Sequence, residues 1–173
     1  YLDRWSGGRL LESYYLAEYE PGATSFKREL IRLFRHDPEC AGFMALMQSV
    51  ASAVRALHEG GVLHNDLGNQ NILLRCRGDA EWTAVQFVDL NRARVRDRLS
   101  ARDRARDLSR IYLPSDLLRV FMEMYSGAVP PSRTLVRWQR IYRLLYAVHA
   151  GTRSLRHPLR SLRRRPAEAE EDV

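Results

Sequence analysis

The sequence predicts an α+β fold in which short strands precede and interrupt a mostly helical chain. Apolar residues recur at spacings of three and four through several long segments, which is the period of an amphipathic helix. Between those segments lie short β-type runs next to Gly and Pro, which are typical of strands and turns. With 173 residues, 45% of them hydrophobic, the chain is long enough to bury one core.

The N-terminal segment predicts a strand over residues 9–20. Its apolar and aromatic side chains follow a Gly7-Gly8 turn, and Pro21-Gly22 stops the run. Helical spacing then predicts two helices, over residues 25–35 and 41–59. A suitable capping residue, Ser, opens the first of them, and a Gly-Gly pair follows the second.

The middle of the chain predicts three short strands around a polar loop. Residues 62–63 and 72–74 are β-type runs that bracket the loop, and residues 84–89 form a third run. The polar segment 75–81 between the last two runs predicts a turn. The loop and the end of the third strand are therefore expected to lie close together.

The C-terminal half predicts helices and then a charged tail. Helical spacing covers residues 101–111, 114–126 and 134–150, with Pro130-Pro131 separating the last two helices. Residues 153–173 are first strongly basic and then acidic, which predicts a solvated and mobile segment. Its leucines at helical spacing also allow an Arg-rich helix on an anionic membrane surface.

The charge balance excludes some partners and leaves others open. The net charge of +7 comes almost wholly from arginine, because Lys27 is the only lysine. Either a GC-rich genome favours Arg codons, or a basic surface attracts anionic partners. The arginines are not interleaved with aromatic residues and no nucleic-acid motif occurs, so we expect no nucleic-acid binding.

Cys40 and Cys76 lack metal-type spacing, which favours a reducing cytosol. The most apolar segment, 43–57, is too polar to span a bilayer.

The strongest functional signal is the pattern H-x-D-L-x-x-x-N over residues 64–71, followed by Asp89 after a short apolar run. Phosphoryl transfer from ATP needs a carboxylate that orients the attacking hydroxyl and accepts its proton. It also needs an amide and a second carboxylate that hold divalent cations on the phosphates. The spacing puts Asp66 and Asn71 at the two ends of one loop. The alternative interpretation is that these side chains only satisfy a turn and cap a strand.

This ordered set of elements resembles the protein-kinase-like superfamily and, within it, the bacterial lipopolysaccharide kinases, which phosphorylate core heptose or 3-deoxy-octulosonic acid sugars. The matching segments are residues 57–63, the catalytic loop, 71–74, 87–89 and 107–110. The resemblance implies a protein-kinase-like α+β fold consisting mainly of the helical C-lobe. It assigns residues 1–20 to the last small-lobe strand and hinge, 21–152 to the C-lobe, and 153–173 to the tail.

The resemblance also implies a role for each site residue. Asp66 is the catalytic base or, more cautiously, the residue that orients the acceptor hydroxyl. Oxygen atoms of Asn71 and Asp89 hold the cation, and such hard ligands suit Mg²⁺ or Mn²⁺. His64 supports the loop backbone. Asp107 is either a buried acid that ties down the catalytic loop or a helix-surface charge paired with an arginine. The adenine of ATP meets backbone groups of the hinge, at Glu18, Tyr19 and Glu20.

Departures from the protein-kinase pattern favour a small-molecule or glycolipid acceptor. Asn65 replaces the usual Arg before the catalytic Asp, and Gly68 stands where eukaryotic-type Ser/Thr kinases carry a Lys. The turn after Asp89 lacks the usual Gly, and only 17 residues separate Asp89 from Asp107. That distance leaves little room for a regulated activation segment. The Gly-rich loop and the phosphate-binding lysine are also missing, since Lys27 follows the hinge.

The sequence therefore predicts an ATP-dependent phosphotransferase that acts on a sugar hydroxyl of the lipopolysaccharide core. The chain does not begin with Met, and we expect a fragment whose phosphate clamp precedes Tyr1. We expect a glycolipid or sugar acceptor as partner, and a cytoplasmic location with peripheral contact at an anionic inner membrane. Two alternatives stay open: an atypical serine/threonine kinase, and a pseudokinase that acts as a binding module.

Overall fold

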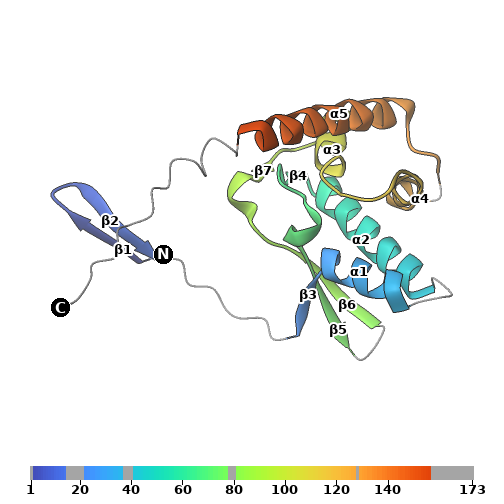
Figure 1. Cartoon of the computed structure of the whole chain (residues 1–173), viewed down its shortest axis with the longest axis horizontal. Coiled ribbons are helices and arrows are strands. Elements are labelled where there is room, and N and C mark those ends of the chain that lie inside the picture. Colours follow the sequence, from blue (N-terminus) through green and yellow to red (C-terminus); the bar gives the residue numbers. More distant parts are fainter. Residues whose placement is uncertain (1, 15–21, 37–40, 78–80, 128, 157–173) are drawn as a thin grey trace, which may run out of the picture.

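A computed structural model describes residues 2–14, 22–36, 41–77, 81–127 and 129–156. Its short strands and its helices follow one another in separate runs, as the α+β prediction requires (Figure 1). In chain order the elements are β1 (Leu2–Ser6), β2 (Arg9–Tyr14), β3 (Ala23–Ser25), α1 (Phe26–His36), α2 (Ala41–Glu59), β4 (Val62–Leu63), η1 (Asn69–Asn71), β5 (Ile72–Arg77), β6 (Glu81–Phe87), η2 (Leu90–Arg92), β7 (Arg94–Val95), α3 (Ala101–Leu108), α4 (Ser115–Ser126) and α5 (Arg133–Arg156).

The described strands form three small antiparallel sheets. β1 and β2 make a hairpin around Gly7-Gly8, where both glycines have positive φ angles, as the predicted turn requires. β5 is the central strand of the sheet β3–β5–β6, and β4 pairs with β7. The predicted strand over 9–20 begins correctly, and β2 ends at Tyr14; residues 15–21 lie outside the described part of the chain. No strand was predicted at β3 or β7, because each has only two or three residues.

Helix α2 lies at the centre of the hydrophobic core. Most of its apolar residues at three- and four-residue spacing are buried, and Leu46, Val50 and Val54 are fully buried. They pack with Phe121 of α4 and Leu108 of α3 in one cluster. Burying a side chain of this size stabilises the fold by about 1.5–3 kcal/mol. Figure 1 shows α5 along α3 at one end of this body and the β3–β5–β6 sheet at the other.

The helix ends follow local signals in the sequence. Ser25 accepts a hydrogen bond from the backbone N–H of Arg28 (3.3 Å), so the predicted cap of α1 is confirmed. α2 covers the predicted residues and gives way to Gly61, whose φ is 76°. A Cβ at Gly61 would clash with the carbonyl oxygen of Arg96, so only glycine fits where β7 approaches.

Four predicted boundaries were wrong. The turn over 75–81 is mostly strand, because β5 continues to Arg77 and pairs there with Glu81 of β6. β6 ends at Phe87, so Asp89 lies beyond the strand. α3 ends at Leu108, while α5 continues to Arg156, past the predicted end at residue 150. No helix in the described ranges is long and apolar enough to cross a membrane.

Candidate active site

The catalytic loop, residues 64–71, connects β4 to β5 and is closed by the short turn η1. The backbone N–H of Asn71 donates to the Gly68 carbonyl at 2.8 Å, which fixes the end of the loop. The N–H of Val88 donates to the Asn71 carbonyl at 3.0 Å, which joins the loop to the segment after β6. The structure therefore brings the segments that carry Asp66, Asn71 and Asp89 to one place, as the spacing predicted.

Asp107 holds the start of this loop from beneath. Its side chain is fully buried on α3. One carboxylate oxygen accepts the backbone N–H of His64 at 2.7 Å and the other accepts the N–H of Asn65 at 2.8 Å. Asn65 has a φ of 65°, a left-handed conformation that is costly for most residues and tolerated by Asn. The two hydrogen bonds to Asp107 maintain that conformation just before Asp66.

His64 links the two segments of the site. Its ring is fully buried. Nε2 donates to the carbonyl oxygen of Val88 at 3.0 Å, and Nδ1 accepts the backbone N–H of Asp66 at 3.3 Å. These partners require the neutral tautomer with the proton on Nε2. The imidazole thus orients the backbone on both sides of the site and has no ring nitrogen left for substrate.

A second histidine, His58 at the end of α2, extends this buried arrangement, and the sequence analysis did not assign it a role. Its Nε2 donates to the Asp107 carboxylate at 3.3 Å, and its Nδ1 lies 2.8 Å from the hydroxyl of Tyr125 on α4. Arg104 donates to the same hydroxyl at 3.4 Å. Burial raises the pKa of Tyr125. We call Asp107, His58, His64 and Tyr125 the buried anchor. The only sequence signal for His58 was its place at a helix end.

Asp66 stands on the opposite, accessible side of the loop. Its side chain is 22% exposed and is contacted by two guanidinium groups. Nη1 of Arg110 donates to one carboxylate oxygen at 2.9 Å, and Nη1 of Arg92 lies 3.6 Å from the other. Arg110 is itself positioned by the ring of Tyr146, whose centroid is 4.3 Å from the guanidinium carbon. The arginines fix the direction of the carboxylate and offset part of its charge.

Asn71 and Asp89 offer oxygen atoms beside Asp66. The amide nitrogen of Asn71 donates to the backbone carbonyl of Asp66 at 2.8 Å, so its amide oxygen points elsewhere and can serve as a ligand. Asp89 is exposed, has a φ of 60°, and accepts a hydrogen bond from Asn91 at 3.0 Å. One amide and one carboxylate oxygen suit a hard cation whose other ligands are phosphates and water. The described residues contain no cluster of three or more His, Cys, Asp or Glu side chains that could hold a metal by itself.

A cavity of about 260 Å³ opens beside Asp66. Lys27, Arg110 and Gln70 contribute polar side chains to it, and Tyr112 closes one side. Tyr112 is tied to the loop, because its backbone N–H and carbonyl exchange hydrogen bonds of 2.9 and 2.8 Å with the Asn69 side chain. The only lysine of the chain therefore lines the same cavity as Asp66, a placement the sequence analysis did not predict. The hinge residues Glu18, Tyr19 and Glu20 lie outside the described residues.

The sequence model of the Lipopolysaccharide kinase (Kdo/WaaP) family matches residues 29–125, which is more than half of the chain and includes the whole loop. The chain belongs to this family. The resemblance stated from the loop motif is thereby confirmed. No curated protein sequence matches the chain closely enough to count as a relative.

A solved structure of a member of this kind has a similar fold. The structure described as WaaP in complex with acyl carrier protein aligns with a TM-score of 0.58 and 22% sequence identity. The alignment covers 76% of this chain and 58% of that one, so the chain spans somewhat more than half of the length of WaaP. The kinase-like α+β fold is thus confirmed.

Proposed function

We propose that this chain carries the acceptor-activating part of an ATP-dependent kinase that phosphorylates a sugar hydroxyl of the lipopolysaccharide core. The observation that carries the proposal is the arrangement of Asp66, Asn71 and Asp89 around one loop whose backbone is held by buried Asp107. Membership of the lipopolysaccharide kinase family supports both the reaction type and the class of acceptor.

In the proposed reaction, Asp66 orients the acceptor hydroxyl and receives its proton as the oxygen attacks the γ-phosphorus of ATP. The bond between that phosphorus and the β–γ bridging oxygen breaks, and ADP leaves. Asn71 and Asp89 would hold Mg²⁺ or Mn²⁺, which offsets the charge of the phosphates. Arg92 and Arg110 keep the Asp66 carboxylate directed, since both contact it from the sides.

The cavity beside Asp66 supports an acceptor that carries an acidic group. Lys27 and Arg110 both line it, and Lys27 has no hydrogen-bond or ion-pair partner among the described residues. A carboxylate or phosphate near the reacting hydroxyl would pair with these cations. The sugar acid 3-deoxy-octulosonic acid has this chemistry, and so does a phosphorylated heptose. Lys27 also supplies positive charge in a site where Gly68 replaces a lysine.

The remaining assignments are proposals of the same kind. We assign residues 1–20 to the end of the small lobe and the hinge, with Glu18 to Glu20 at the adenine, residues 21–152 to the C-lobe, and 153–173 to a charged tail. We place the protein in the cytoplasm, peripheral to an anionic inner membrane that presents the glycolipid. Because the matched WaaP structure contains acyl carrier protein, a carrier protein is a further partner to be tested.

The test compares acceptors on the full-length protein with labelled ATP. We expect transfer to lipid A–core oligosaccharide and none to generic protein substrates. Asp66→Ala should remove transfer and leave nucleotide binding intact, whereas Asp89→Ala should remove the metal-dependent part of nucleotide binding. Asp97→Ala is the matched control, because Asp97 is an exposed acid close in sequence with no hydrogen bond to a described residue. Unchanged turnover in Asp66→Ala would contradict the site, and transfer only to protein would contradict the acceptor.

A further inference from the structure

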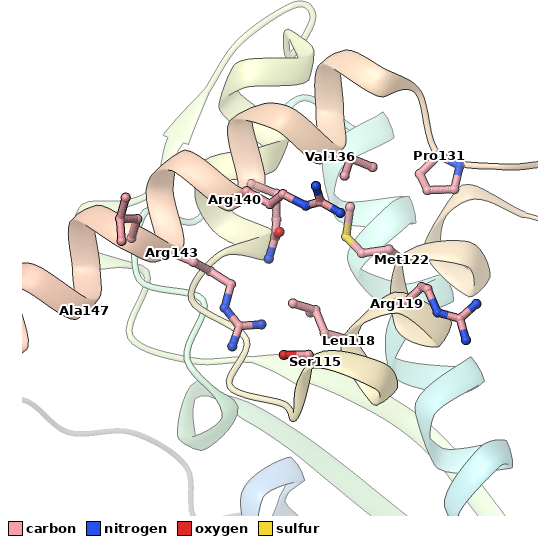
Figure 2. Close-up of a pocket in the computed structure, with 11 residues that line it drawn as sticks. Ser115, Leu118, Arg119, Met122, Pro131, Val136, Arg140, Arg143 and Ala147 are labelled. Atoms are coloured by element: carbon pink, nitrogen blue, oxygen red, sulfur yellow. The ribbon is translucent and has the colours of Figure 1, made fainter.

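A cavity of about 600 Å³ lies between α4 and α5, away from the residues assigned to phosphoryl transfer. Part of its lining is apolar and part is cationic, and none of the lining residues is acidic. Figure 2 shows Arg140 and Arg143 pointing from α5 into the space between the two helices. The apolar part includes Leu118, Met122 and Val136, and the cationic part Arg119, Arg140 and Arg143.

Gln139 gives this cavity an unused hydrogen-bond donor. The side chain lines the cavity and is only 4% exposed. Its amide nitrogen is buried and has no hydrogen-bond partner within the part of the chain that the structure describes. An unpaired buried donor is costly and rare in folded proteins, so it points to an acceptor that binds there.

The arginines of the cavity also have N–H donors that are not used in hydrogen bonds. Arg119 pairs with Glu123 at 3.2 Å, and Arg143 donates to the Leu113 carbonyl at 3.3 Å. Arg140 has no hydrogen-bond or ion-pair partner among the described residues. Each guanidinium has five N–H donors, so these contacts leave most of them unused. A ligand for this set of groups must be rich in acceptor oxygens and negatively charged, as a phosphate is.

The surface around the cavity has the character of a membrane-binding face. Helix α5, which forms one wall of the cavity, contains six arginines and no Asp or Glu. On α5, Leu144 and Val148 follow the arginines and are 68% and 56% exposed. Cations next to exposed apolar side chains suit an anionic lipid surface better than a small soluble ion.

We propose that the cavity between α4 and α5 binds the phosphate of an anionic phospholipid headgroup. Arg140, Arg143 and Gln139 donate to the phosphate oxygens, and the apolar part of the cavity contacts the start of the lipid chains. The site adjoins the acceptor cavity through the backbone, because Arg143 holds Leu113 next to Tyr112, which pairs with the catalytic loop. A bound lipid therefore sets the orientation of the catalytic cavity at the membrane. This proposal does not depend on the phosphoryl-transfer reaction.

The test is co-sedimentation of the full-length protein with phosphatidylcholine vesicles that contain or lack phosphatidylglycerol. We expect binding only to the anionic vesicles, and Arg140→Gln should weaken it about fivefold, the usual contribution of one basic residue near such a surface. Gln139→Met keeps the volume and the net charge and removes the donor. It should also weaken binding, while its thermal midpoint stays equal to or above that of the wild type. Arg28→Gln, an exposed arginine on α1, is the matched control and should bind as the wild type does.

Several outcomes overturn the proposal. Equal vesicle binding by Gln139→Met and the wild type would show that surface charge, and not the cavity, holds the membrane. A loss of vesicle binding in Arg28→Gln equal to that in Arg140→Gln would lead to the same conclusion. Thermal stabilisation by inorganic phosphate that depends on Gln139, without vesicle binding, would assign the site to a soluble phosphate compound in place of a lipid. Kinase activity on a soluble acceptor is measured in parallel, so a failed catalytic assignment remains distinguishable from a failed lipid site.

Discussion

The two sides of the catalytic loop differ in whether their polar groups are buried and paired or accessible. The buried anchor beneath it has its polar groups paired with one another or with the loop backbone. The open face above it, formed by Asp66, Asn71 and Asp89, leaves oxygen atoms accessible, and the Asp66 carboxylate contacts exposed or half-exposed arginines. Paired buried groups stabilise a conformation, whereas accessible oxygens can bind a substrate or a cation. From this comparison we propose that Asp107, on the buried side of the loop, has a structural role and that Asp66, on the accessible side, takes part in the chemistry.

The largest expected difference is between Asp107→Ala and Asp66→Ala. Asp107→Ala leaves the buried N–H groups of His64 and Asn65 without acceptors, and each costs about 1–3 kcal/mol of the free energy of unfolding. Asp66→Ala removes only partly exposed ion pairs, which contribute about 0–1 kcal/mol. Urea denaturation followed by circular dichroism measures both values. Similar losses of stability in the two variants would contradict the proposal that Asp107, and not Asp66, stabilises the loop.

A smaller effect is expected within the open face. Lys27→Gln removes one cation from the acceptor cavity, so KM for an acidic acceptor should rise about tenfold, which corresponds to one charge-assisted hydrogen bond of about 1.4 kcal/mol. The fold should be unaffected, because Lys27 is exposed. Steady-state kinetics with an acidic and with a neutral sugar acceptor show whether the rise in KM depends on the acidic group. An equal rise in KM for both sugars would contradict the pairing of Lys27 with an acidic group.

The smallest effect concerns the pH dependence of the buried anchor. Burial raises the pKa of the Tyr125 hydroxyl above its ordinary value of 10.0, so the folded state holds the proton more tightly than the unfolded state. This contribution to stability is fully present below pH 10 and is lost as the pH rises through the raised pKa. Tyr125→Phe should lose about 1 kcal/mol at neutral pH with the hydrogen bond to His58, and its stability should fall less between pH 9 and 11. Urea midpoints at several pH values give both quantities. Parallel pH profiles would exclude Tyr125 as the titrating group.

Elements with a strong local period could be predicted well from the sequence. α2 lies where the spacing of its apolar residues placed it, and Ser25 caps α1 as expected. β3 and β7 were missed because such short strands depend on pairing with β5 and β4, which local sequence does not encode. The polar residues at 75–77 were read as a turn, and pairing with β6 makes them a strand.

In the site, too, features that depend on local spacing could be predicted, and contacts between distant segments could not. The spacing of Asp66 and Asn71 within one loop indicated that both belong to it, because the residues between them are few. The partners of that loop could not be predicted in this way. His64 and Asp107 are 43 residues apart, His58 and Tyr125 are 67 apart, and Arg110 and Asp66 are 44 apart. Lys27 was excluded from the phosphate clamp by its position in the sequence, yet the folded chain places it beside Asp66.

The sequence by itself determined the helices, the order of the catalytic elements and the identity of the loop residues, because these depend on spacing over a few residues. Only the tertiary structure decided which polar groups meet. Packing of α2 against α3 and α4 makes Asp107 a buried acceptor for the loop backbone, and the segment between α3 and α4 brings Arg110 to Asp66. The physical reason is that a buried polar group must find partners, and those partners come from distant parts of the chain that share one core.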